Sequence, residues 1–110
     1  MPTAFPHHTP VDHTPRERMN VVVDDEESTD ALQAVSSSTA QQILAALDEP
    51  ATASDIAAGI DTSVQNATYH LDRLRETGLV EAIDTWYSAK GTEMTVYALA
   101  AEEFVVRLSR

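Results

Sequence analysis

The sequence predicts an α+β, mostly helical fold, in which a core of helices is followed by a β-hairpin and then by one extra C-terminal helix. Changes in the spacing of apolar residues predict this order. Up to residue 77 they recur at steps of three and four, which is the period of an amphipathic helix. From Leu79 to Leu99 they alternate, as they do in strands. The helical spacing returns from Ala100 onward.

Four helices are expected before the hairpin, each with its apolar residues on one side. In chain order they cover residues 29–35, 39–47, 55–59 and 63–77. The first has a candidate N-cap in Ser28 or Thr29, and the third has one in Ser54. The last three helices are expected to form the trihelical core.

The fourth helix carries the clearest local signals. Thr62 and Gln65 fit a capping box, and Ser63 is the alternative N-cap. Gly78 stands where a helix-ending left-handed residue is expected, and Leu79 follows in the position that packs back. The side expected to face the core carries four apolar residues: Val64, Ala67, Leu71 and Leu74.

The hairpin is expected over residues 79–99, with strands at 79–87 and 93–99 joined by a polar loop that contains Gly91. A last helix is expected over residues 100–109, because the apolar residues of this segment recur at helical spacing. These residues are Ala101, Phe104, Val105 and Leu108.

Residues 1–27 are expected to form a disordered tail, and residues 28–110 the folded domain. The tail holds four of the five prolines and three of the four histidines, and it ends in four consecutive acids. Without a helical or strand period it cannot bury enough surface to offset its ordering entropy. Histidines without fixed geometry make no preorganised metal site, so no metal is predicted. Met19 is an alternative start of the chain.

The composition excludes several classes of protein. Cysteine is absent, which excludes disulfides, thiolate metal sites and cysteine nucleophiles, and three glycines are too few for a glycine-rich phosphate loop. No apolar run approaches the length of a membrane span. We therefore expect a small cytoplasmic protein with no membrane association, no cofactor and no identifiable small-molecule ligand.

The charge is strongly acidic. Seven Lys and Arg residues stand against 18 Asp and Glu residues, which gives a net charge of −11, and Lys90 is the single lysine. Acid excess, little lysine and many small residues are typical of proteins adapted to a cytoplasm rich in potassium salt. The alternative is an ordinary acidic protein that its net charge keeps in solution.

Three helices followed by a hairpin is the layout of a winged helix-turn-helix. Residues 68–80, Thr-Tyr-His-Leu-Asp-Arg-Leu-Arg-Glu-Thr-Gly-Leu-Val, resemble the Ser-x-His-Leu-x-x-Leu-x-x-x-Gly-Leu-Val signature of the ArsR-like family of transcriptional regulators. Residues 38–44, 53–57 and 96–99 also resemble segments of that family. The likeness covers residues 36–100, and the composition is similar to that of its halophilic-archaeal members.

The resemblance implies that the fourth helix enters the major groove of DNA and that the hairpin flanks it. It also implies a symmetric dimer formed by helices outside the core. Ala40 stands where the family commonly has an arginine, and the absent cysteines remove the thiolate metal-sensing site.

The arc of the fourth helix opposite its expected core side is the candidate DNA-reading surface. Amide side chains can bond adenine edges, arginine can bond guanine or phosphate, and tyrosine can contact a thymine methyl or a phosphate. The expected contacts are Ser63, Gln65, Asn66, Thr68, Tyr69 and Arg73, with Lys90 at the tip of the wing. We expect His70 to have a packing role, and Arg75 to lie over the core near the helix end. The alternative is that the arc is an ordinary solvated helix face.

The expected dimer interface is apolar and lies outside the trihelical core. It consists of Leu32, Val35, Ala101, Phe104, Val105 and Leu108. A two-fold protein suits a two-fold DNA site. The alternative is that the last helix packs back onto its own chain.

The sequence therefore predicts a homodimeric, sequence-specific regulator that binds double-stranded DNA, with repression favoured over activation. The competing hypothesis is a winged helix that binds another protein in a transcription-related assembly without touching DNA. Residues 36–99 carry nine acids against three cations, which favours this second hypothesis. No enzyme is predicted, because the chain has no nucleophile elbow, no histidine pair on a helix and no metal-ligand cluster.

Overall fold

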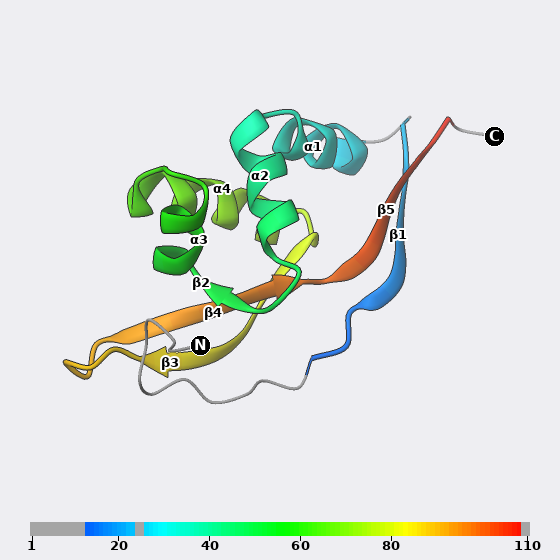
Figure 1. Cartoon of the computed structure of the whole chain (residues 1–110). Helices are drawn as coiled ribbons and strands as arrows, with labels where there is room; N and C mark the ends of the chain where they lie inside the picture. The colour runs from blue at the N-terminus through cyan, green and yellow to red at the C-terminus, as the bar shows by residue number, and fades with distance from the viewer. Residues whose placement is uncertain (1–12, 24–25, 109–110) are drawn as a thin grey trace.

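A computed structural model describes residues 13–23 and 26–108, and the helices lie over one side of the strands (Figure 1). In chain order the elements are β1 (Arg16–Val22), α1 (Glu26–Val35), α2 (Ser38–Ala46), β2 (Ala51–Thr52), α3 (Ala53–Gly59), α4 (Val64–Glu76), β3 (Val80–Tyr87), β4 (Glu93–Leu99) and β5 (Ala101–Arg107). The strands form an antiparallel sheet in the order β2-β4-β3 and a two-stranded parallel ribbon of β1 and β5. No helix in the described part of the chain is long and apolar enough to cross a membrane.

The core lies between the helices and the β3–β4 hairpin. Side chains from the four helices meet Leu79, the first residue of β3 and one residue of β4. The largest members are Ile43, Leu47, Ile56, Leu71, Leu74, Leu79, Val80 and Tyr97. The expected core side of α4 is confirmed at Ala67, Leu71 and Leu74, each of which has no exposed surface.

Hydroxyl side chains cap the starts of α2, α3 and α4. Ser63 is the N-cap of α4, since its Oγ accepts the backbone N–H of Asn66 at 3.0 Å. Of the two expected N-caps, Ser63 is therefore confirmed and Thr62 is not. The expected cap of α3 at Ser54 is wrong, because Thr52 accepts the Asp55 N–H at 3.2 Å and the helix begins earlier. The expected caps of α1 at residues 28 and 29 are also wrong, because that helix already begins at residue 26.

Gly78 ends α4 as expected. Its φ is +82°, and its N–H bonds the carbonyl of Arg75 at 3.0 Å. The N–H of Leu79 bonds the carbonyl of Leu74, also at 3.0 Å, which completes the paired bonds of a Schellman turn. A side chain other than glycine rarely adopts this conformation, so Gly78 fixes the angle at which the chain leaves α4 and enters β3.

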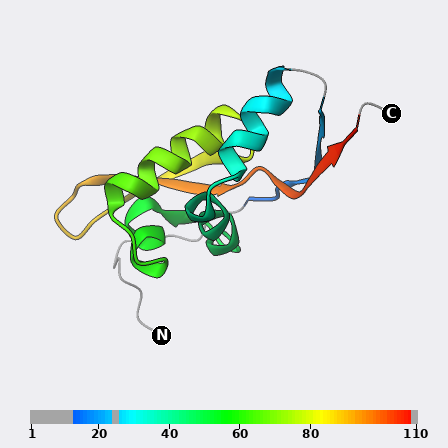
Figure 2. The same ribbon diagram turned by 90° about the horizontal axis from the view of Figure 1, so that it is seen from above.

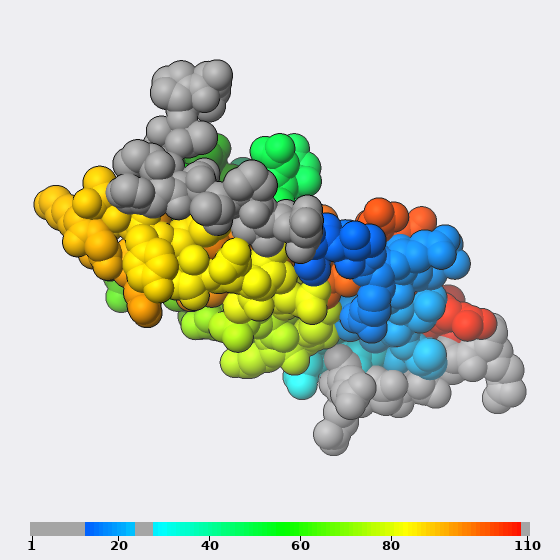
Figure 3. Space-filling model, turned by 90° about the horizontal axis from the view of Figure 1, so that it is seen from below, coloured from blue at the N-terminus to red at the C-terminus, as the bar shows by residue number. Residues whose placement is uncertain are grey.

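The hairpin is confirmed. β3 and β4 pair from Val80 with Leu99 to Tyr87 with Glu93, and a register shift lies between Ala82 and Asp84. Strand β2 extends the sheet on the other side of β4. Viewed from below, β3 and the hairpin loop form one end of an elongated surface, and β1 lies toward the other (Figure 3).

The expected C-terminal helix is wrong, because residues 101–107 form strand β5. The four apolar residues recur at steps of three, one and three, and this spacing fits a half-buried strand as well as a helix. Phe104, Val105 and Val106 have aromatic or β-branched side chains, which favour strands, and β1 offers them a partner.

The expected tail is wrong at residues 16–22, which form β1. This strand pairs in parallel with β5, from Arg16 opposite Ala101 to Val22 opposite Arg107. The expectations for residues 1–12 and 24–25 lie outside the described residues.

The β1–β5 ribbon has one apolar and one mixed face. Met19 and Val21 lie beside Phe104 and Val106 on the apolar face. Val21 is buried, and Met19 and Phe104 pack against the core, so this face attaches the ribbon to the helices. A two-stranded ribbon is marginally stable alone, and its stability here depends on that contact.

Candidate nucleic-acid interface

The exposed face of α4 lies opposite its buried residues. Gln65 and Tyr69 project from it, and Tyr69 is 56% exposed. Val64 was expected to face the core but is 49% exposed, because the first turn of α4 extends past the core cluster. The first two turns therefore present an amide, a phenol and an apolar side chain to solvent.

Three of the predicted contact residues also shape the start of the helix. The Asn66 side-chain amide donates to Thr62 Oγ1 at 3.0 Å, and the Thr68 hydroxyl donates to the Val64 carbonyl at 2.8 Å. Ser63 serves as the N-cap. A two-pronged bond from Asn66 to a base would compete with its bond to Thr62, so Gln65 and Tyr69 are the better placed of the predicted residues.

His70 and Arg73 flank this face and are half-buried. The His70 ring meets the Tyr69 ring edge to face, with centroids 5.1 Å apart and planes at 77°. Such a contact restricts the directions in which the Tyr69 phenol can point. His70 thus packs against the exposed side chain of Tyr69.

Acidic side chains divide α4 into two halves. Residues 62–71 contain no acid and no Lys or Arg, whereas Asp72 and Glu76 are exposed on the C-terminal half. The N-terminal half is the part that usually contacts base edges in helix-turn-helix proteins. Phosphates near the C-terminal half would meet carboxylates as well as Arg73.

Arg75 joins α4 to the hairpin. It was expected to lie over the core near the helix end, and its guanidinium acts on the phenol of Tyr97 on β4, whose pKa it lowers. Burial raises the pKa of Tyr97 above its ordinary value of 10.0, and the Asp72 carboxylate raises it further. Arg75, by its charge and its hydrogen bond, and a hydrogen bond with Thr95 oppose this shift.

This environment predicts an alkaline loss of stability. Because folding raises the pKa of Tyr97, the unfolded chain loses the phenolic proton first as pH rises, and stability then falls above about pH 10. Tyr97→Phe should remove that fall, which urea unfolding at pH 8 to 11 would measure. Tyr87→Phe is the matched control, since Tyr87 is 47% exposed. If Tyr97→Phe left the alkaline fall unchanged, another group would cause it.

The hairpin loop is organised around Ser88. Its Oγ accepts the N–H groups of Lys90 and Thr92 at 3.3 and 3.1 Å, and Gly91 has a φ of +81°. Lys90 is exposed at the tip, as expected. The loop and the first turn of α4 lie at the same end of the molecule (Figures 1 and 2).

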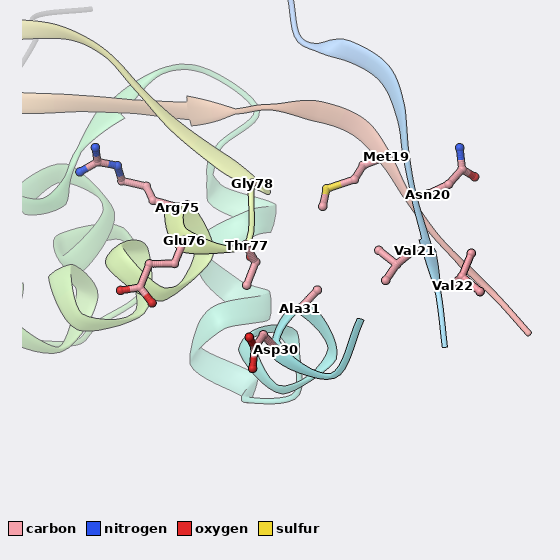
Figure 4. Close-up of a pocket in the computed structure, with 10 residues that line it drawn as sticks. All are labelled: Met19, Asn20, Val21, Val22, Asp30, Ala31, Arg75, Glu76, Thr77 and Gly78. Carbon is pink, nitrogen blue, oxygen red and sulfur yellow. The ribbon is translucent and has the colours of Figure 1, made fainter. Parts of the chain in front are cut away.

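A pocket of about 450 Å³ lies at the opposite end of α4, where that helix meets α1 and β1. Carboxylates of Asp30 and Glu76 line it, while Arg75 turns away toward the sheet (Figure 4). Within residues 13–23 and 26–108, no three His, Cys, Asp or Glu side chains are grouped to hold a metal ion.

The residues expected in a dimer interface do not share one surface. Val35 and Phe104 pack against the chain's own core, and Ala101 is buried. Leu32 and Val105 are half-buried, and Leu108 is 76% exposed. Because β5 is a strand, Phe104 and Val105 point to opposite faces of the ribbon.

Solved structures with this arrangement are known. A possible transcriptional regulatory protein from Mycobacterium bovis is 26% identical with a TM-score of 0.58, over 70% of this chain and 77% of that one. The homodimeric winged helix-turn-helix DNA-binding domain of a possible ArsR-family transcriptional regulator, also from Mycobacterium bovis, is 23% identical with a TM-score of 0.58, over 70% and 67%. The fold is a winged helix-turn-helix. Reduced HlyU from Vibrio cholerae is 25% identical with a TM-score of 0.53, over 69% and 75%.

Within this winged helix-turn-helix, residues 35–83 match the helix-turn-helix domain family. The matched segment runs from the end of α1 into β3 and includes α3 and α4, the helix-turn-helix pair. The β3–β4 hairpin is the wing. A comparison with curated proteins gives no match.

Proposed function

We propose that this chain is a sequence-specific transcriptional regulator that inserts α4 into the major groove of double-stranded DNA. The observation that carries the proposal is the exposed, acid-free N-terminal half of α4, directly opposite a fully buried face. The match to helix-turn-helix domains supports it, as do the regulatory proteins that share the fold.

Each exposed side chain at this end suits a particular DNA group. Gln65 can bond an adenine edge, and Tyr69 can contact a thymine methyl or reach a phosphate. Val64, which was expected in the core and is 49% exposed, adds a second apolar contact for a thymine methyl. Arg73 is suited to guanine or phosphate, and Lys90 on the wing to the backbone beside the groove.

The first test truncates the reading face. Gln65→Ala and Tyr69→Ala should each weaken binding to the preferred duplex by about 1–3 kcal/mol, because each removes a base contact. The duplex is first selected from a random-sequence library with the wild-type protein, and binding is then measured by fluorescence anisotropy. Lys90→Ala should weaken binding equally on all sequences, because it removes a backbone contact.

The matched control is Gln42→Ala, since Gln42 is an exposed glutamine on α2, away from this face. It should leave DNA binding unchanged. Equal losses for Gln42→Ala and Gln65→Ala would show that α4 does not read the DNA.

The finer features of the proposal follow from size, charge and symmetry. A homodimer suits a two-fold DNA site, and the Mycobacterium bovis DNA-binding domain that shares this fold is homodimeric. A domain bound over a promoter blocks other proteins without further machinery, so repression is favoured over activation. The net charge of −11 with a single lysine suits a halophilic cytoplasm, where concentrated salt screens the repulsion between acids.

The alternative function is a winged helix that binds another protein. The net charge of −6 over residues 36–99 and the exposed Asp72 and Glu76 favour it. The library selection separates the two functions, because a protein-binding module enriches no DNA sequence while remaining folded by circular dichroism.

A further inference from the structure

The outer edge of β5 is a strand edge without a partner strand among the described residues. β5 pairs with β1, and β1 lies between β5 and α1 (Figure 2). Half of the backbone N–H and C=O groups of such a strand point away from its neighbour, ready to pair with another strand.

Apolar side chains accompany this edge. Phe104, Val106 and Leu108 alternate along one face, and Val106 and Leu108 are 42% and 76% exposed. The face is therefore covered by α1 and the core at one end and reaches solvent at the other. A partner strand that continued the ribbon on the same side would cover these residues.

The charges along β5 favour a second copy of the same strand. Two β5 strands related by a two-fold axis perpendicular to the ribbon run antiparallel and keep the same face on the same side. In the register centred on Val105, Glu103 lies opposite Arg107 of the partner subunit, and this pair occurs twice. Phe104 then lies opposite Val106 of the partner subunit, so these charged and apolar residues find complements, and Glu102 lies opposite the exposed Leu108 of the partner subunit.

The registers centred one and two residues earlier lack this match. Centring on Phe104 places Glu103 opposite a valine, and centring one step earlier, on Glu103, places two carboxylates together. Glu103 also bonds Arg18 of its own β1 at 2.9 Å, so in the favoured register its carboxylate lies between two guanidinium groups.

We propose that the winged helix-turn-helix dimerises by antiparallel pairing of β5 with β5 about Val105, which forms a four-stranded sheet in the order β1-β5-β5-β1. This inference rests on the homodimer of the proposed function and assigns its interface to a strand edge.

Exchange of the paired charges tests the register. Arg107→Glu and Glu103→Arg should each raise the dimer dissociation constant about tenfold, because each turns two attractive pairs into repulsive ones. The two changes combined with Arg18→Glu, which keeps a charge partner for residue 103 on its own β1, should restore it to near the wild-type value. Sedimentation equilibrium of the full chain measures these constants. Arg16→Glu is the matched control, since it makes the same change of charge on β1, outside the interface.

A thiol tests the centre of the interface. The chain contains no cysteine, so Val105→Cys introduces a single thiol that would face its symmetry mate. A short bifunctional thiol reagent should link this variant into dimers, whereas Ala89→Cys at the wing tip should stay unlinked.

Three results would overturn the proposal. The first is a protein that stays monomeric at every concentration up to about 100 µM. The second is a dimer whose dissociation constant is unchanged by Arg107→Glu. The third is a Val105→Cys variant that the thiol reagent links no better than Ala89→Cys. Failure of the proposed function is distinguishable, because Tyr69 lies outside this interface. A Tyr69→Ala protein should bind its preferred duplex more weakly and remain a dimer. A linked wild-type-like dimer that binds no DNA would contradict the proposed regulator and leave the proposed interface standing.

Discussion

Replacing Leu71 by alanine is expected to lower the free energy of unfolding by about 2–5 kcal/mol. Leu71 is fully buried in the middle of α4, among residues of the core cluster that include Ile43 and Leu74. Truncation removes its contacts and leaves a cavity that a close-packed core of this size fills poorly. Urea unfolding followed by circular dichroism at constant salt measures the change.

Val64→Ala is the matched control, because it shortens an aliphatic side chain on the same helix at a position that is 49% exposed. It should change stability by less than about 0.5 kcal/mol. Similar losses at both positions would mean that α4 packs with a different side inward.

The affinity of this protein for DNA is expected to depend only weakly on salt, unlike that of most DNA-binding proteins. A protein that makes six to ten phosphate contacts loses roughly 10³–10⁵ in affinity between 50 and 200 mM salt, as counterions are released. Residues 36–99 offer only Arg73, Arg75 and Lys90 as cations, on a chain with a net charge of −11. Because Arg75 faces Tyr97 on the sheet, Arg73 and Lys90 are the two cations left to neutralise phosphates, so the loss should stay at about tenfold per bound subunit.

Above roughly 0.5 M the slope should be shallow or positive, because the screening length falls toward ~3 Å and repulsion between acids and phosphates disappears. An anisotropy titration in potassium chloride, with folding checked at each concentration, measures this slope. A steep negative slope on folded protein would show that phosphate contacts dominate and would contradict the halophilic interpretation.

The parts of the fold that could be predicted are those specified by neighbouring residues. Gly78 and Leu79 predict the end of α4, because a Schellman turn needs a glycine followed by a residue that packs back against the helix. The strand at residues 93–99 was predicted with its observed bounds, since alternation and a polar loop identify a hairpin locally.

The ribbon could not be predicted, because its two strands lie about 80 residues apart and neither is convincing alone. Residues 16–22 follow a proline-rich segment and precede acids, so their composition resembled a tail. In β5 the apolar spacing fitted a helix as well as a strand, and the presence of β1 decides between them.

The candidate site was predictable as a face and less so residue by residue. The helical period places Gln65 and Tyr69 opposite the core wherever α4 packs. The exposure of Val64 depends on where the core ends along the helix, and the bond from Asn66 to Thr62 depends on the turn before it. Neither the period nor the residue types contain that information.

The β1–β5 ribbon also determines the order in which the chain can fold. Its pairing closes almost the whole polypeptide into one loop, and that entropic cost must be met before any ribbon contact is gained. The helices and the hairpin have nearby partners and can form first, and the two end strands join last onto a core that already exists. By the same reasoning the ribbon is the unit with the lowest opening free energy, so its amide hydrogens should exchange with solvent well before those of α4.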